Sequence, residues 1–342
     1  MTVAAAGSSF FGLHCVTHPA GDATTLFPSK EGYPLVIQQA QAKAPARRQN
    51  ALSPRAKRRA RIAYAIIIPF LVYLCLWNLI PLIYGLYLGL TEYNGLTAQP
   101  KFIGLRNFRD FFSNPIYTTL LLRQLWMGAL CVGLNTIISF AVALALNVAR
   151  KGRGFFRSVI YIPCLTAASV TTSIFVALLE SPNGMMDMLL KMMGMKPITW
   201  VYSQFWMTFW IVFYFVWKQM GPAAIIWLGG LQAIDPELYD AAKVDGANRW
   251  QQVRYITIPG LRFVTTYILL TGIIHAMQMF DVVMFISAGG PYGTTDVLMY
   301  HIYRNGIVTF NLGMAGAEST VLGLLTSIIA IVYFRVSTRK ED

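Results

Sequence analysis

The sequence contains six long and mainly apolar stretches, each of which is long enough to cross a lipid bilayer as a helix. A membrane-spanning helix needs about 20 predominantly apolar residues. Because hydrocarbon cannot hydrogen-bond to the backbone, such stretches are stable in a membrane as helices. The six stretches cover roughly residues 64–90, 121–148, 157–179, 205–230, 263–287 and 313–335. We therefore predict an all-α integral membrane protein built as a bundle of six transmembrane helices.

The composition agrees with a protein that crosses the bilayer several times. Hydrophobic residues make up 56% and charged residues only 13% of the chain, whereas soluble domains contain about 25% charged residues. The net charge is +13. The basic residues flank the apolar stretches and do not form a basic patch mixed with aromatic residues, so we expect no nucleic-acid partner.

The distribution of Lys and Arg predicts the orientation of the spans. Residues 41–61, the loops at 149–158 and 231–262 and the C-terminal end carry 19 Lys and Arg residues, and the segments on the opposite side carry 7. Cytoplasmic loops are the ones enriched in these residues. We therefore expect both termini and the 231–262 loop to be cytoplasmic.

The chain is expected to form one membrane domain between two tails. Residues 1–60 are rich in Ala, Gly, Pro, Gln and Arg, which is typical of a disordered tail. The helical domain is expected to cover residues 61–336, and residues 337–342 form a second, short tail. The four cysteines do not have the spacing of a metal or redox site, and we predict no metal site and no bound cofactor.

The loop at 231–262 contains signals for two short helices. Asp235 is placed as an N-cap with Pro236 at the first helical position, and Gly246 is placed to end that helix. Asn248 and Gln251 have the spacing of a capping box, which starts a second helix. An amphipathic helix pair at the lipid interface is one interpretation. A docking surface for a protein is the other, and it is favoured because the first helix presents alanines, which anchor poorly in lipid.

The same loop resembles the EAA motif of the permease subunits of bacterial ABC importers. That motif is Glu-Ala-Ala, three residues, Gly, nine residues, Ile, one residue and Leu-Pro. The sequence departs from the motif in two places, with Asp240 in place of Glu and Ile258 in place of Leu. The resemblance implies an ATPase-coupling role for Asp240, Ala241, Ala242, Asp245, Gly246, Ile256 and Pro259.

Further segments resemble the sugar-type permeases of this family, and the resemblance extends over roughly residues 60–336. These segments are residues 102–108, 159–170, 227–247 and 285–306. The resemblance implies a type I ABC importer permease of the bacterial inner membrane that carries a di- or oligosaccharide or a glycerol-phosphate-like solute. The implied partners are a second homologous permease, two cytoplasmic ATPase subunits and an extracytoplasmic solute-binding protein.

The chain itself is not expected to be an enzyme. It lacks the G-x-x-x-x-G-K-[ST] pattern of a nucleotide-binding loop, so the partner subunits are expected to use the ATP. Three other functions stay open from the sequence: an ABC permease for a non-sugar solute, a self-contained channel or carrier, and a polytopic membrane enzyme. The enzyme would need clustered acidic and histidine side chains, and no HExxH or DxD pattern is present.

Polar residues inside the spans are candidates for the solute path. A charged side chain at the centre of a span costs about 2.5–3.5 kcal/mol on insertion scales, so it is expected to face the bundle or a wet cavity. The candidates are Lys218 and Gln219 in the fourth stretch and His275, Gln278 and Asp281, spaced by three, in the fifth. A structural role between helices is the alternative for all five.

Three further polar residues are interpreted as structural or solvated. Asn135, in the second stretch, is interpreted as a hydrogen-bonding contact between helices. Glu180 and Glu318 lie near the outer ends of their stretches and are expected to be solvated.

Overall fold

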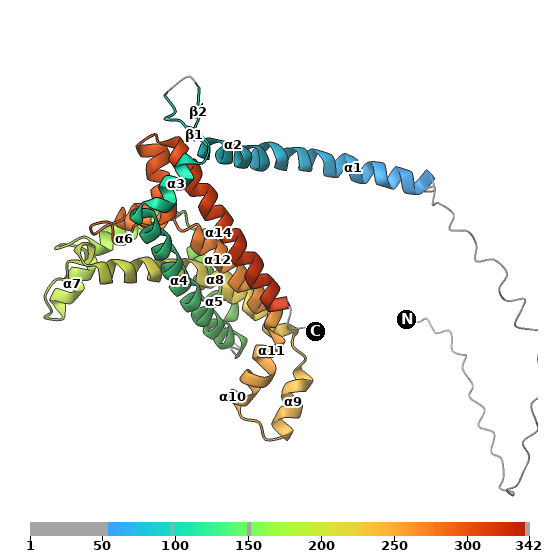
Figure 1. The fold of residues 1–342 in the computed structure, drawn as a ribbon. Helices are drawn as coiled ribbons and strands as arrows, with labels where there is room; N and C mark the ends of the chain where they lie inside the picture. Colours follow the sequence, from blue (N-terminus) through green and yellow to red (C-terminus); the bar gives the residue numbers. More distant parts are fainter. Residues whose placement is uncertain (1–53, 97–98, 149–151, 339–342) are drawn as a thin grey trace, which may run out of the picture. The chain divides into compact units, whose positions relative to one another are not determined.

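The computed structural model describes residues 54–96, 99–148 and 152–338, which form helices and one short β-hairpin (Figure 1). The chain divides into two compact units, residues 1–68 and 69–342. The described part of the first unit is the beginning of helix α1 (Pro54–Leu74), and all the features described below other than α1 belong to the second unit. Most of the predicted N-terminal tail, residues 1–53, and the last four residues lie outside the described residues.

Helix α1 begins at Pro54, inside the segment that the sequence suggested would be a disordered tail. Proline is well suited to the first turn of a helix, because the N–H that it lacks has no helical partner there. A π-helical turn (Cys75–Leu79, η1) and α2 (Ile80–Gly89) continue α1, so that residues 61–89 form one span-length helix.

Three more helices are long and apolar enough to cross a membrane: α4 (Pro115–Val148), α8 (Gln204–Ala233) and α14 (Leu312–Thr338). Two bent helix pairs bring the total to six spans if each pair counts as one. One pair is α5 (Arg153–Leu165) with α6 (Ala168–Leu179), bent by 94°, and the other joins Arg249–Gly260 to α12 (Arg262–Met277), bent by 70°. The predicted multi-span helical fold is confirmed, and the predicted third and fifth spans are not single straight helices.

The third predicted span breaks because its backbone becomes extended at Thr166, where ψ is 138°. Pro163 lies three residues earlier and cannot donate a helical hydrogen bond. The hydroxyl of Thr166 donates to the carbonyl of Ile162 over 2.9 Å, which satisfies one of the acceptors left open by the break.

The fifth predicted span, residues 263–287, ends early because α12 stops at Met277. The chain then turns and resumes as a π-helical segment, η4 (Val283–Ser287). Val282 and Val283 are completely or almost completely buried in a cluster that contains Phe175 of α6. Burial of these valines against α6 favours the change of direction over a continued straight helix.

The remaining elements are short and lie in the connections. They are β1 (Thr91–Glu92), β2 (Lys101–Phe102), α3 (Arg106–Ser113), α7 (Met185–Met192), η2 (Trp200–Tyr202), α9 (Pro236–Val244), α10 (Arg249–Gln252), η3 (Val253–Thr257), α11 (Ile258–Gly260), α13 (Leu298–Tyr303) and η5 (Arg304–Val308). Strands β1 and β2 pair antiparallel, with Thr91 opposite Phe102. Figure 1 shows this hairpin and the α9–α10 pair at opposite ends of the helical bundle.

Helix α8 is central to the core, because it packs against α4, α5 and α12. Its fully buried Met207 and Ile211 belong to one cluster with α4 and η4, and its Trp227 and Leu228 belong to a second cluster with α4 and α12. Gly221 allows α5 to approach closely, since a Cβ there would overlap the carbonyl of Ile160. Helix α8 is therefore held by neighbouring helices on most of its length.

Candidate functional site

The first helix of the 231–262 loop begins and ends where the sequence predicted. A side-chain oxygen of Asp235 accepts a hydrogen bond from the backbone N–H of Glu237 over 2.9 Å, and α9 starts at Pro236. Gly246 has a φ of +78°, which is a left-handed backbone conformation. Residues other than glycine adopt this conformation only at a cost in free energy. The N–H of Ala247 donates to the carbonyl of Ala242 over 2.9 Å, which closes the end of the helix.

The second helix begins with the predicted capping box. The N–H of Gln251 donates to the side chain of Asn248 over 2.8 Å, and the N–H of Asn248 donates to the side chain of Gln251 over 2.7 Å. A hydrogen bond of 3.0 Å between the hydroxyls of Tyr239 and Thr257 joins the two arms of the loop. The loop is therefore an ordered helix–bend–helix.

The outer surface of this loop carries exposed apolar side chains beside charged ones. Val244 is 88%, Trp250 68% and Tyr255 70% exposed. Of the residues implied by the EAA resemblance, Ala242 and Ile256 are partly buried, and the others, Asp240, Ala241, Asp245, Gly246 and Pro259, are exposed. Exposed large apolar residues on an ordered charged loop are typical of a protein-docking surface.

Asp240 forms an ion pair with Lys243 over 2.8 Å, and both side chains are more than half exposed. Exposed pairs of this kind contribute about 0–1 kcal/mol, because water screens them. The carboxylate of Asp240 is therefore accessible to a basic group of another protein at little cost to this chain.

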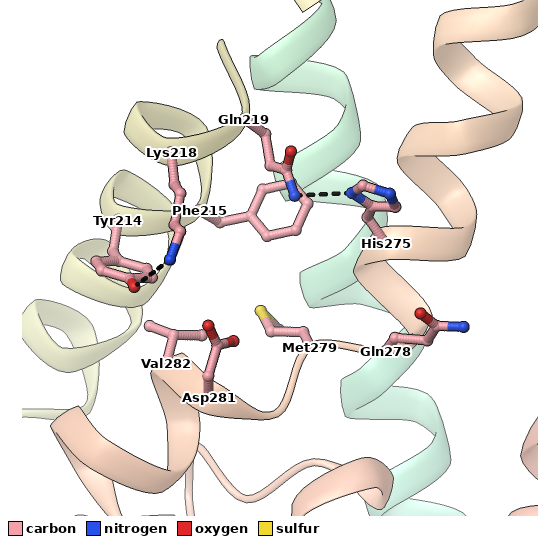
Figure 2. Close-up of a pocket in the computed structure, with 9 residues that line it drawn as sticks. All are labelled: Tyr214, Phe215, Lys218, Gln219, His275, Gln278, Met279, Asp281 and Val282. Atoms are coloured by element: carbon pink, nitrogen blue, oxygen red, sulfur yellow. Dashed lines mark hydrogen bonds between the residues drawn. The ribbon is translucent and has the colours of Figure 1, made fainter. Parts of the chain in front are cut away.

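A polar cavity of about 220 Å³ lies between α8 and the broken end of α12 (Figure 2). We call it the Lys218 groove. Its lining brings together all five polar residues that the sequence proposed for the solute path, with Tyr214, Phe215, Met279 and Val282 beside them. The lining residues are drawn in Figure 2 as Tyr214, Phe215, Lys218, Gln219, His275, Gln278, Met279, Asp281 and Val282.

The five polar residues lie together because α12 breaks, and not because three of them share one helical face. The spacing of three predicted one helical face for His275, Gln278 and Asp281, but α12 ends at Met277 and Asp281 stands beyond the turn. The break brings Asp281 to the groove from a second segment. Broken helices inside a membrane are tolerated where the irregular backbone lines a cavity.

Hydrogen bonds hold part of the groove in place. The ammonium of Lys218 donates to the hydroxyl of Tyr214 over 3.3 Å and lies 5.6 Å from the centre of the Tyr214 ring. The amide of Gln219 and Nδ1 of His275 are 2.7 Å apart. Neither Lys218 nor Asp281 forms an ion pair within the described part of the chain. The groove therefore offers one cation, one anion and several neutral polar groups to a ligand.

A buried polar cluster at the end of the bundle near the β-hairpin was not expected from the sequence. Glu318 is fully buried, so the expectation that it is solvated was wrong. Its carboxylate lies 3.1 Å from Nδ1 of His301 and accepts from the amide of Asn305 over 2.5 Å. These partners come from α13 and η5 and cover the carboxylate. Glu180, by contrast, is exposed, as predicted.

The loop after η4 is fixed by two arginines whose role the sequence did not indicate. Arg123 of α4 donates to the backbone carbonyls of Gly293 and Asp296. Arg304 lies 3.6 Å from the carboxylate of Asp296. Burial raises the pKa of Asp296 above its usual value, and the nearby Arg304 opposes that shift. The loop is therefore held by fixed contacts to α4 and to η5.

Similar proteins of known family point in the same direction as this geometry. Residues 137–340 match the family model described as "Binding-protein-dependent transport system inner membrane component". A trehalose/maltose transport system permease protein from Thermococcus litoralis is 28% identical over 83% of this chain and 96% of that protein. An sn-glycerol-3-phosphate transport system permease protein from Pectobacterium atrosepticum is 26% identical over 82% of this chain and 95% of that protein.

The fold is also similar to a solved structure. A crystal structure of a bacterial ABC transporter involved in the import of the acidic polysaccharide alginate superposes with a TM-score of 0.75, at 23% identity, over 83% of this chain and 98% of the other chain. At that identity the likeness concerns the fold. The family match covers more than half of the sequence, and the chain therefore belongs to the family of binding-protein-dependent transport system inner membrane components.

Proposed function

We propose that this chain forms one half of the transmembrane path of an ATP-driven, binding-protein-dependent carbohydrate importer. The observation that carries the proposal is the Lys218 groove, which gathers amide, imidazole, carboxylate, ammonium and phenol groups beside an aromatic ring between two membrane helices. Sites of this kind, with a few polar groups among apolar walls, bind small polar ligands. Several relatives carry names of transport systems for trehalose and maltose, for starch degradation products and for sn-glycerol 3-phosphate.

The charge of the groove favours a neutral sugar over an anionic solute. Lys218 and Asp281 carry opposite formal charges, so the groove as a whole has little net charge. A phosphate would meet the ammonium of Lys218 but also the carboxylate of Asp281, and like charges at short range are repulsive. Hydroxyl groups can both donate and accept, and they suit such a mixed set of partners.

The α9–α10 loop supports coupling to a cytoplasmic ATPase. Its capped helices and left-handed Gly246 make a rigid element, and its exposed Val244, Trp250 and Asp240 suit docking into a protein cleft. In the proposed mechanism two ATPase subunits close on ATP and move this loop, and the bundle alternates between its two openings. ATP and solute must each favour one of these conformations for transport to occur. Both termini and the loop are cytoplasmic in this arrangement.

The proposed assembly contains a second homologous permease, two ATPase subunits that use the ATP, and an extracytoplasmic solute-binding protein. The experiment is reconstitution of this complete assembly in proteoliposomes, with uptake of radiolabelled maltose, trehalose and sn-glycerol 3-phosphate measured with and without ATP. We expect ATP-dependent uptake of at least one of the two disaccharides, and weaker or no uptake of glycerol phosphate.

Two outcomes would contradict the proposal. Uptake that proceeds without ATP and without the ATPase subunits would identify a self-contained carrier. Failure of both disaccharides, together with uptake of a non-sugar solute, would place the chain among permeases of another substrate class. Co-purification of the ATPase after mild detergent extraction, and its loss in a Gly246→Pro variant that still inserts in the membrane, tests the coupling loop separately.

A further inference from the structure

A second cavity, of about 180 Å³, adjoins the Lys218 groove between the same helices. It shares Phe215, Gln219 and His275 with the groove, and it continues along α8 to Ile226 and along α12 to Tyr267. These residues lie nearer to the α9–α10 loop in both helices. The two cavities therefore follow one another along the bundle, and we call the second one the Asn135 cavity.

The contact between Gln219 and His275 lies at the boundary between the two cavities, because both residues line both of them. In Figure 2 this hydrogen bond crosses the side of the Lys218 groove that lies away from Asp281. Phe215 also lines both cavities, so this contact and the Phe215 side chain stand between the groove and the second cavity.

Asn135 of α4 lines the second cavity and carries a buried acceptor that has no partner among the described residues. The residue is only 5% exposed, and its Oδ1 is buried without a hydrogen-bond partner among the described residues. The helix–helix hydrogen bond predicted for this residue is therefore not made through Oδ1. Buried amide oxygens are almost always hydrogen-bonded in folded proteins, so an open one calls for a ligand or a water molecule.

The rest of the cavity lining selects the chemistry of that ligand. The hydroxyl of Thr271 already donates to the carbonyl of Tyr267 over 2.8 Å, within its own helix. No Lys or Arg lines the cavity in the described part of the chain, in contrast to the groove with its Lys218. An open acceptor without a cation suits a neutral hydroxyl donor and disfavours an anion.

We infer that the Asn135 cavity is a second sugar-binding site on the same path, reached after the Gln219–His275 contact opens, in which Oδ1 of Asn135 accepts a hydrogen bond from a sugar hydroxyl. This inference rests on the proposed function and adds a site to it. The first site, the Lys218 groove, contains groups of both charges, Lys218 and Asp281. The second site, the Asn135 cavity, lies nearer to the α9–α10 loop and would hold the sugar through the neutral amide oxygen of Asn135.

The test uses the complete importer in vesicles that expose the α9–α10 side. Thr271→Cys reports on the Asn135 cavity and Gln278→Cys reports on the Lys218 groove, each in a background without other reactive cysteines. The label is 2-sulfonatoethyl methanethiosulfonate, a charged reagent that does not cross the bilayer, and the ligand probe is maltose. We expect maltose to slow the labelling at Thr271→Cys.

The variant Asn135→Leu keeps a similar volume and removes the acceptor. We expect it to raise the maltose concentration that half-protects Thr271→Cys by about five- to tenfold, the effect of one lost hydrogen bond between neutral groups. Thr136→Val is the matched control, because the Thr136 hydroxyl donates to the carbonyl of Val132 in its own helix and does not line the cavity. We expect this control to leave the half-protecting concentration unchanged.

A second variant guards against a folding defect in Asn135→Leu. Ile226→Phe enlarges an apolar side chain of the Asn135 cavity and removes no polar group, and we expect it to reduce protection at Thr271→Cys and not at Gln278→Cys. Equal protection in wild type, Asn135→Leu and Ile226→Phe would overturn the inference.

The inference and the proposed function fail in different ways. If the importer takes up maltose but maltose never protects Thr271→Cys, the second site is refuted and the proposed function stands. If the wild type takes up neither disaccharide, the proposed function fails and the inference fails with it.

Discussion

The bend at Gly246 allows a quantitative test, because the strain of its backbone can be separated from steric contact. Gly246 has a φ of +78°, and a Cβ at this position would have no neighbour within 4 Å. Replacement by alanine therefore adds backbone strain alone. The left-handed conformation costs a non-glycine residue about 1–2 kcal/mol, and each 1.4 kcal/mol is about a tenfold change in an equilibrium.

If the bend is required for docking, Gly246→Ala is expected to weaken the apparent affinity of the permease for its ATPase by up to about thirtyfold, the equivalent of about 2 kcal/mol, since only the bent fraction is competent. Gly246→Asn should lose less, because asparagine tolerates the left-handed conformation better. Gly246→Pro should abolish coupling, because proline cannot adopt this φ and removes the N–H that donates to the carbonyl of Lys243. Co-purification of the ATPase and ATP-dependent uptake, measured on protein of equal membrane content, give the two readouts.

Gly104 provides the matched control for this series. It has a φ of +64° and no neighbour within 4 Å of a Cβ, but it lies before α3, away from the α9–α10 loop. Gly104→Ala carries the same kind of strain and is expected to leave ATPase binding unchanged. Equal loss in Gly104→Ala and Gly246→Ala, or normal uptake in Gly246→Pro, would refute the reasoning.

Three further variants test the packing, the docking surface and the buried cluster. Gly221→Val is expected to reduce the yield of folded protein in mild detergent, because the new side chain would overlap the carbonyl of Ile160 in α5. Gly229→Ala is the control. Its Cβ would have no neighbour within 4 Å, so the yield of folded protein should not change. Trp250→Ser removes a ring that is 68% exposed, so the free energy of unfolding should change by less than about 0.5 kcal/mol. The amount of ATPase that co-purifies is expected to fall. An unchanged amount would show that the ring takes no part in docking. Glu318→Ala leaves Nδ1 of His301 and the amide of Asn305 without their buried partner and should destabilise the protein by about 1–3 kcal/mol. Thermal unfolding in detergent measures this loss, and unchanged stability would show that the buried cluster does not stabilise the fold.

Local signals in the sequence predicted much of the fold and of the α9–α10 loop. The caps at Asp235 and Asn248 and the glycine at 246 act over three to five residues, so the sequence alone contains all of the partners involved. The apolar stretches likewise predicted the span-length helices, because the need to satisfy the backbone in lipid depends only on length and composition.

The outcome was different where a residue's surroundings come from distant segments. Glu318 was expected to be solvated because it lies near the end of its stretch, but the chain between 298 and 311 folds back and buries it beside His301 and Asn305. Arg123 gave no sequence signal for its role, since the carbonyls that it binds are more than 165 residues away. Burial and long-range pairing of this kind follow from packing, and no spacing rule encodes them.

The sequence by itself determined that this chain is a multi-span helical membrane protein with an ordered, capped loop, because helix length and capping are local properties. Only the tertiary structure decided that α12 ends at Met277, that Asp281 joins Lys218 in one groove, and that Asn135 lines a second cavity with its Oδ1 buried and without a partner among the described residues. The break after α12 is favoured because Val282 and Val283 pack against α6. The second cavity exists because the side chains of α4, α8 and α12 do not fill the space between these helices. Side-chain packing between segments far apart in the chain sets such positions, and it is resolved only when the whole bundle forms.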